Sequence, residues 1–414
     1  MRRASSKDLL TALRGSRAVA SPGCGTPGTL LDLIGENAAA LQMSLFSGLL
    51  LGKYPFLDAV RAKEMTYGTW HVMPPVRDLV ATGDVPFYPV RASRVPQLLE
   101  HLTVDTALVR LSPPDRHGFC SLGPSVSYSR GAMRRARTVI AELDPNVPRT
   151  RGESEVHVDE VDLFVDSEVA MPEYRRAPVD EVSAAIARHL VAILPQRPTI
   201  QIGIGAIPEA FVDQLVTDRV GDLRFAGMAT DGMADVFAAG LLDVELHHGY
   251  PGVMAAELMG SKELMEFADD NAAIGVYSTE RAITASSLWG MDRFVTINSA
   301  LAVDLAGQVA ADGWAGRQIS GVGGSIDFTE AAMHSHGGVR IIALAASDVR
   351  RNSSKIVESL GPGTPVTLPR HSVDWVVTEH GAARLEGLSL QERGEALREL
   401  ASPTSDRTIL KKGS

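Results

Sequence analysis

The stretch IQIGIGAIPEAFVDQL, residues 200–215, decides the fold class of this 414-residue chain. It begins with the alternating pattern of a strand, passes through a Gly-x-Gly turn, and continues with the apolar spacing of a helix. Pro208 stands where the first helical turn is expected, because its missing N–H has no partner to lose there. A strand, a glycine turn and a helix in this order make one unit of an α/β fold.

A similar succession of strand end, glycine turn and helix is predicted in the first half of the chain, where SPGCGTPGTLLDLI spans residues 21–34. Short β-branched runs alternate with amphipathic helical stretches throughout, so we predict an α/β protein of two similar domains. The charged, proline-containing segment MPEYRRAPVD at 171–180 is the expected boundary. The domains are therefore predicted at 1–175 and 176–414.

The composition excludes several classes of function. The formal net charge is −10 and the arginines are scattered, which leaves no basic patch for a nucleic acid. No apolar run reaches the length of a membrane span and the first residues lack a secretory core, so we expect a cytoplasmic protein without a membrane partner. Cys24 and Cys120 lie far apart in sequence, which indicates free thiols rather than a disulfide framework.

The glycine-rich turn of the first half has the formal spacing of a dinucleotide-binding loop. Gly23, Gly25 and Gly28 fit Gly-x-Gly-x-x-Gly. No acidic residue occurs between Glu36 and Asp58, where a ribose-binding carboxylate would be needed. The sequence therefore disfavours a dinucleotide.

Two glycine loops of the second half are candidates for contacts to an anion. The turn at 203–207 would point backbone N–H groups at a phosphate, although a tight strand-to-helix turn without a ligand explains it equally well. In ISGVGGSIDF (319–328), Gly321, Gly323 and Gly324 allow a nest of amides for a developing oxyanion. A bulge or a hairpin turn is the structural alternative for this loop.

Several further segments carry a resemblance to a known family: SPPDRHGFCSLG (112–123), DPNVPRTRGES (144–154), ELMGSKELMEFADDN (257–271), VTINSALAVDLAGQV (295–309), GVGGSIDFTEAA (321–332) and VVTEHGAARLEGLSLQERGEAL (376–397). With these the chain resembles the acetyl-CoA hydrolase/transferase family, which includes acetate and 4-hydroxybutyrate CoA-transferases of the glutamate-dependent class I type. The resemblance implies two α/β domains of the CoA-transferase type with the active site at the domain interface, and a homodimer.

The resemblance also implies a set of ligand contacts. CoA and acyl-CoA would be substrates together with a small carboxylate, with no permanently bound cofactor and no metal. Gly323 and Gly324 would contact the reacting thioester. The residues expected to contact CoA are Gly203, Ile204, Gly205, Ala206, Ile207, Asn298, Gly321, Val322 and Arg340.

Enzymes of this family work by ping-pong transfer through a glutamate. The carboxylate attacks the acyl-CoA thioester, the released CoA thiolate attacks the resulting anhydride, and the glutamyl-CoA thioester is then reversed by an acceptor carboxylate. Family members carry this glutamate a few residues before a Ser-Asp-Gly turn. In the matching stretch RFAGMATDGMADV (224–236), Gly227 occupies its position. The usual nucleophile is therefore missing.

Glu257, in the apolar stretch MAAELMG (254–260), is the candidate that replaces it. This stretch reads as a buried strand followed by a glycine turn, and a buried charge is costly unless something satisfies it. Three hypotheses remain open. Glu257 is the relocated nucleophile of a CoA-transferase, or it is the general base of a hydrolase acting on a CoA thioester or on a carbon–carbon bond of a CoA-linked substrate, or the protein is a catalytically silent acyl-CoA binder. The structural alternatives for this residue are a buried carboxylate paired with an arginine or with backbone amides, and a surface-facing glutamate on an edge strand.

Other chemistry-bearing residues give weaker signals. The pairs His247–His248 and His334-x-His336 lack acidic or cysteine partners at ligand spacing, which argues against a metal. His117 is expected to shape the wall of the cleft. Asp327 follows the glycine loop and is expected to orient its amides.

Overall fold

A computed structural model of the protein describes residues 1–348 and 353–401. The chain forms two compact units. The first unit contains Met1–Arg175, Gly227–Asp231 and Glu245–Ser287, and the second contains Arg176–Ala226, Gly232–Val244 and the chain from Leu288 onward. The first unit therefore ends its main segment at the residue where the sequence predicts a domain boundary, and it also includes two later segments. Glu257 belongs to one of these later segments.

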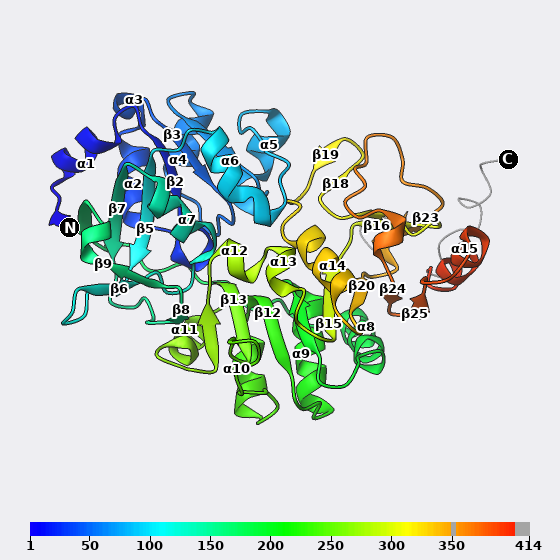
Figure 1. Ribbon diagram of the computed structural model, residues 1–414. Helices are drawn as coiled ribbons and strands as arrows, with labels where there is room; N and C mark the ends of the chain where they lie inside the picture. The colour runs from blue at the N-terminus through cyan, green and yellow to red at the C-terminus, as the bar shows by residue number, and fades with distance from the viewer. Residues whose placement is uncertain (349–352, 402–414) are drawn as a thin grey trace. The chain divides into compact units, whose positions relative to one another are not determined.

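The first unit is built on a seven-stranded parallel sheet (Figure 1). Its strands lie in the order β1 (Arg2–Arg3), β10 (Leu163–Asp166), β7 (Thr138–Leu143), β5 (Thr106–Leu111), β2 (Arg17–Ala20), β3 (Ser44–Ser47) and β4 (Thr66–Thr69). The unit also contains the antiparallel pair β6 (Phe119–Ser121) and β9 (Glu155–His157), and the neighbouring strands β13 (Val253–Leu258), β14 (Ile274–Val276) and β8 (Arg151–Gly152).

The helices of this unit connect and cover its strands. They are α1 (Ser6–Leu13), α2 (Gly28–Glu36), α3 (Ala38–Leu41), α4 (Phe56–Arg61), α5 (Arg77–Thr82), α6 (Val95–His101), α7 (Ser127–Arg135), α11 (Lys262–Ala268) and α12 (Thr279–Ala282), with short 3-10 turns η1 (Gly23–Gly25), η2 (Pro74–Val76), η3 (Ala92–Arg94) and η4 (Val158–Glu160). Helix α13 (Ala285–Leu288) ends one residue after Ser287, the last residue of the unit. Apolar side chains of α1, α2, α4 and the central strands form one buried core, as the periodicity of these segments requires.

The second unit repeats the central part of this topology. Its sheet has the order β25 (Gly381–Arg384), β24 (Trp375–Thr378), β20 (Val339–Ala343), β15 (Phe294–Ser299), β11 (Thr199–Ile202) and β12 (Arg224–Ala229). The last three residues of β12 are assigned to the first unit. In chain order, β11, β12, β15, β20 and β24 occupy the same relative places in their sheet as β2, β3, β5, β7 and β10 do in theirs. The predicted α/β fold of two similar halves is confirmed at this level.

Helices α8 (Glu181–Ala192) and α14 (Ser325–His334) pack on this sheet, α8 on β24 and α14 on β15 and β20 (Figure 1). Asp180 caps α8 by accepting a hydrogen bond from the amide of Ser183 at 2.8 Å, and Ile186 and Leu190 are buried as the apolar spacing predicts. The remaining elements are α9 (Ala206–Thr217), α10 (Asp231–Ala238), α15 (Leu390–Glu399), η5 (Arg370–Ser372), β16 (Ala302–Asp304), β17 (Val309–Ala310), β18 (Gly313–Trp314), β19 (Arg317–Gln318), β21 (Ser347–Asp348), β22 (Ser353–Ser354) and β23 (Ile356–Val357).

Candidate active site

Glu257 lies in a strand that is buried along its whole length. All six residues of β13 are buried, and Glu257 itself is 5% exposed. Strand β13 pairs in parallel with β14 on one side, and the bridge between Ser125 and Glu257 lies outside the regular strands. The predicted buried strand is confirmed, so the carboxyl group needs a partner or must lose its charge.

The two carboxyl oxygens of Glu257 have different surroundings. The hydroxyl of Ser127 donates a hydrogen bond to Oε1. Oε2 is buried and has no hydrogen-bond partner within the part of the chain that the structure describes. No cation pairs with this glutamate among those residues, so the alternative of a structural salt bridge to an arginine is wrong for the described chain.

The burial of this carboxyl changes its acid strength. Removal from water raises the pKa of Glu257 to about 8, and the hydrogen bond donated by Ser127 opposes that rise. The group is therefore mostly neutral at pH 7, and its ionised form is more basic than an ordinary carboxylate. A perturbed carboxyl of this kind is suited to act as a base or as a nucleophile.

The first glycine loop lies against the free oxygen. Gly23 has a φ of +55°, and a Cβ placed on it would lie 3.8 Å from Glu257 Oε2 and 2.8 Å from the sulfur of Met259. The Ser125 hydroxyl donates to the carbonyl of Pro22 at 2.8 Å and accepts from the amide of Gly25 at 3.1 Å, which fixes the loop. A side chain at position 23 would enter the space next to the carboxyl.

Gly227 and Glu257 lie on the neighbouring strands β12 and β13, one residue out of register. The amide of Met259, just after β13, donates to the carbonyl of Ala229, the last residue of β12, at 2.8 Å. The carboxyl ends of the two strands therefore meet, and in this parallel register Met228 lies opposite Glu257 while Gly227 lies opposite Ala256. Gly227 has a φ of +94°, a conformation that glycine adopts without strain. In a regular parallel sheet, side chains at positions 227 and 257 would point to opposite faces, and the relocation of the carboxylate stays a prediction.

The turn at 203–207 belongs to the second unit, where it joins β11 to α9. Gly205 has a φ of +126° and precedes the first residue of α9, and no heavy atom lies within 4 Å of a Cβ placed on Gly203 or Gly205. Packing alone does not require these glycines, and amides at the start of a 12-residue helix attract anions. Ile204, Ala206 and Ile207 are half-buried.

Asn298 lies in the same unit at the end of β15, next to β11. Its amide nitrogen donates to Thr296 Oγ1 at 2.7 Å, and the Thr296 hydroxyl donates to Gln201 Oε1 at 2.5 Å. Because β11 and β15 are paired with Gln201 opposite Thr296, this network fixes Asn298 beside the strand that leads into the 203–207 turn. The contact of Asn298 with CoA stays a prediction.

The loop at 321–324 leads into α14 and does not form a hairpin turn. Gly323 has a φ of +59° and Gly324 is the N-cap residue of the helix. A Cβ on Gly324 would lie 2.5 Å from the ring of Phe328, so packing alone explains this glycine. Gly321, Val322 and Gly323 are half-buried, and their contact with a thioester stays a prediction.

Arg340 has a partner that the sequence does not suggest. The Arg340 guanidinium and its backbone amide both bond to the Asp374 carboxylate, with Nε to Oδ2 at 2.9 Å, and the Arg340 side chain is 15% exposed. A contact with a CoA phosphate would therefore compete with an existing ion pair. Asp327 is fully buried in α14.

The remaining candidates are two histidine segments, a metal site and the two cysteines. His117 is exposed and accepts a hydrogen bond from Arg116, and the ring of His247 packs edge-on against that of the neighbouring His248. In residues 1–348 and 353–401, no group of three potential ligands could hold a metal ion, and no helix is long and apolar enough to cross a membrane. Cys24 and Cys120 are free and buried, which confirms the prediction of free thiols, and burial raises the pKa of each to about 11.

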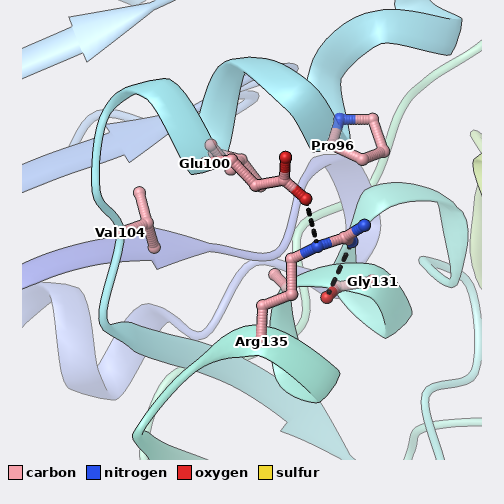
Figure 2. Close-up of a pocket in the computed structure, with 7 residues that line it drawn as sticks. Pro96, Glu100, Val104, Gly131 and Arg135 are labelled. Carbon is pink, nitrogen blue, oxygen red and sulfur yellow. Dashed lines mark hydrogen bonds and ion pairs between the residues drawn. The ribbon is translucent and has the colours of Figure 1, made fainter.

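Neither of the two cavities described in the first unit contains Glu257. One, of about 360 Å³, lies between α6 and α7, and Figure 2 shows the Arg135 guanidinium at its rim between the Glu100 carboxylate at 2.7 Å and the Gly131 carbonyl. The other, of about 420 Å³, includes Gly260 and Ser261 directly after β13. The carboxyl end of a parallel strand is a common ligand position, so the second cavity lies closer to where a site is expected.

Sequence reasoning missed four residues around the carboxyl: Gly23, Ser125, Ser127 and Met259. The signal for the serines is GPSVSYS (123–129), which places two hydroxyls two residues apart before a helix. Nothing in the sequence indicates that this segment faces residue 257, because the bridge joins positions more than 130 residues apart.

The chain matches two family models, the acetyl-CoA hydrolase/transferase N-terminal domain over residues 11–173 and the C-terminal domain over residues 260–413. It is 32% identical over 399 residues to 4-hydroxybutyrate coenzyme A transferase of Clostridium kluyveri, which covers 95% of this chain and 93% of the relative. The chain belongs to the acetyl-CoA hydrolase/transferase family. The resemblance found in the sequence is confirmed.

Solved structures agree with this assignment. RipA from Yersinia pestis superimposes with a TM-score of 0.88 at 26% identity, covering 97% of this chain and 94% of that one. More distant members include an acetyl-CoA hydrolase of Kluyveromyces lactis, 22% identical over 91% of this chain and 81% of the relative. This family member is therefore an enzyme of the CoA-transferase and acetyl-CoA hydrolase type. Glu257 lies outside both matched domains, three residues before the C-terminal one.

Proposed function

We propose that this enzyme is a CoA-transferase that moves CoA between an acyl-CoA and a small carboxylate, with Glu257 as the nucleophile. The observation that carries the proposal is the buried carboxyl group of Glu257, which has a pKa raised to about 8, one oxygen without a partner and no pairing cation among the described residues. The resemblance in sequence implies that Gly227 stands where relatives carry the glutamate.

The chemistry proceeds by exchange of bonds at carbonyl carbons. The ionised carboxylate adds to the acyl-CoA carbonyl, the C–S bond breaks, and CoA leaves as a thiolate with formation of an acyl-glutamyl anhydride. The thiolate attacks the glutamyl carbonyl and expels the first carboxylate, leaving a glutamyl-CoA thioester. An acceptor carboxylate repeats these two steps in reverse, which gives the new acyl-CoA and regenerates Glu257. Amides of the 203–207 turn and of the 321–324 loop are proposed to contact CoA and the thioester.

The burial of Glu257 favours transfer over hydrolysis. Every intermediate of the transfer is a reactive acyl derivative, and water would divert it to free acids. The carboxyl of Glu257 is surrounded by apolar residues and hydroxyls, and it is removed from solvent. A hydrolase would instead need a water molecule held beside this carboxyl.

The decisive experiment traps the glutamyl thioester. The enzyme is incubated with acyl-CoA, treated with hydroxylamine or borohydride, digested and mapped by mass spectrometry. We expect modification of the peptide containing Glu257 and loss of exchange in Glu257→Ala, whereas Glu263→Gln, which removes an exposed carboxylate on α11, retains activity. A modified peptide without Glu257, or full turnover by Glu257→Ala, would refute the proposal.

Hydrolysis of an acyl-CoA is the second candidate function, because a carboxyl with a pKa of about 8 is also a competent general base for water. It predicts thiol release without any acceptor and no trapped thioester. A silent acyl-CoA binder would show affinity for CoA without turnover of any donor.

The proposal also implies a cofactor requirement, a compartment and an oligomeric state. CoA enters and leaves as substrate, and the steps above require no permanently bound cofactor. We further infer a cytoplasmic homodimer, as the family resemblance and the two free thiols suggest. Sedimentation at micromolar concentration tests the dimer, and activity after dialysis against a chelator tests the absence of a metal requirement.

A further inference from the structure

We propose that Ser127 is a positioning residue that holds Oε1 of Glu257 and thereby leaves Oε2 as the reacting oxygen. This inference rests on the proposed function of Glu257. It assigns different roles to two oxygens that are chemically equivalent in a free carboxylate.

The hydrogen-bond geometry around the carboxyl carries the proposal. The Ser127 hydroxyl donates to Oε1, while Oε2 is buried without a partner in the described chain. Ser127 is itself buried, with 4% exposure, at the first residue of α7. A donor fixed on a helix restricts rotation of the carboxyl group, because turning it would give up the hydrogen bond.

The free oxygen faces an element that lacks a side chain. A Cβ on Gly23 would lie 3.8 Å from Oε2, and the 23–25 turn is fixed through Ser125 and not through the carboxyl itself. In the transfer, Oε2 forms the bond to the acyl carbon as the C–S bond breaks. Oε1 then becomes the carbonyl oxygen of the anhydride and keeps its bond from Ser127 throughout.

The position of Ser127 also controls the fraction of ionised Glu257. A hydrogen bond donated to a carboxylate stabilises the ionised form, so its loss raises the pKa of the carboxyl further above 8. Cys24 of η1 and Tyr128 of α7 are the other titratable groups whose charge acts on or responds to Glu257. Burial raises the pKa of Cys24 to about 11 and that of Tyr128 well above 10, so both stay neutral between pH 6 and pH 9.

The test compares two serines on the same helix. Ser127→Ala removes the donor, and Ser129→Ala removes a buried hydroxyl that has no hydrogen-bond partner in the described chain. The dependence of kcat/KM on pH is measured between pH 6 and pH 10. For Ser127→Ala we expect the midpoint of the rise to move upward by about 1 and kcat/KM at pH 7 to fall about tenfold, since a hydrogen bond to a charged group is typically worth that much.

Further measurements keep the inference separate from the proposed function. Ser127→Thr retains a hydroxyl and is expected to restore the wild-type midpoint, and Ser129→Ala is expected to leave it unchanged. In a variant that has lost activity, the pKa of Glu257 is read instead from the pH dependence of the free energy of unfolding. An unchanged midpoint in Ser127→Ala, while Glu257→Ala is inactive, would overturn the role of Ser127 alone. Full turnover by Glu257→Ala would instead overturn the proposed function.

Discussion

The buried carboxyl of Glu257 predicts an unusual dependence of stability on pH. Its pKa rises from an ordinary 4.5 to about 8 in the folded protein, because burial disfavours the charge. An acid with a raised folded pKa stabilises the fold fully below pH 4.5, and that contribution is lost as the pH rises to about 8. The difference of about 3.5 in pKa corresponds to about 5 kcal/mol in total, of which about 4 kcal/mol falls between pH 5 and pH 9.

Glu257→Gln removes this titration while keeping an oxygen that accepts from Ser127. We expect the free energy of unfolding of the variant, relative to the wild type, to increase by about 4 kcal/mol as the pH rises from 5 to 9. Urea denaturation of both proteins at pH 5, 7 and 9 measures this quantity.

Glu153→Gln is the matched control. Burial works toward a higher pKa for Glu153, but the bonds from the Ser278 amide and from Arg281 hold that pKa below its usual value. Its contribution to stability changes only at lower pH, so the difference between Glu153→Gln and wild type stays flat from pH 5 to pH 9. A flat difference for Glu257→Gln as well would show that Glu257 titrates normally in the folded protein, and the argument from its raised pKa would fail.

Two further pairs of substitutions test the turn beside Glu257 and a separate buried ion pair of the first unit. Gly23→Ala introduces a Cβ 2.8 Å from a methionine sulfur at a φ of +55°, so we expect exchange activity to fall at least tenfold. Gly83→Ala is the control, because Gly83 has a φ of +81° but no heavy atom lies within 4 Å of a Cβ placed on it. We expect this variant to lose about 1 kcal/mol of stability and no activity. Arg110→Met leaves the buried Glu142 carboxylate without its cation at 2.7 Å, so we expect the free energy of unfolding, measured by urea denaturation, to fall by about 3–5 kcal/mol. Arg3→Met removes an exposed ion pair and should lower it by less than about 1 kcal/mol. Equal losses within either pair would contradict these assignments.

The alternation of strand and helix patterns was sufficient to predict the fold. Segments such as 180–194 and 339–347 become α8 and β20, because their apolar spacing matches the faces that pack on the sheet. Domain membership was harder to predict, since the chain returns to the first unit at 227–231 and 245–287. Such a return depends on which strands pair, and local sequence does not encode it.

The candidate site was likewise predictable from the sequence only in part. A glutamate inside an apolar strand identifies Glu257 directly, because burial of a carboxyl without a function is costly. Its partners come from distant segments, and Ser127 is separated from it by 130 residues. The contact of Arg340 with a CoA phosphate stays a prediction. A basic residue at a matching position suggests a ligand contact, but the structure pairs it with Asp374.

The raised pKa of Glu257 has opposing effects on the proposed transfer. At pH 7 a carboxyl with a pKa of about 8 is ionised in about one molecule in ten, which costs about 1.4 kcal/mol in the barrier. The same shift makes the ionised oxygen more basic and hence more nucleophilic toward a thioester. Without the bond from Ser127 the ionised fraction would fall by about another factor of ten. We therefore infer that this serine keeps the carboxyl basic enough to attack and acidic enough to ionise, which makes the 127–257 pair, rather than the glutamate alone, the functional counterpart of the residue missing at 227.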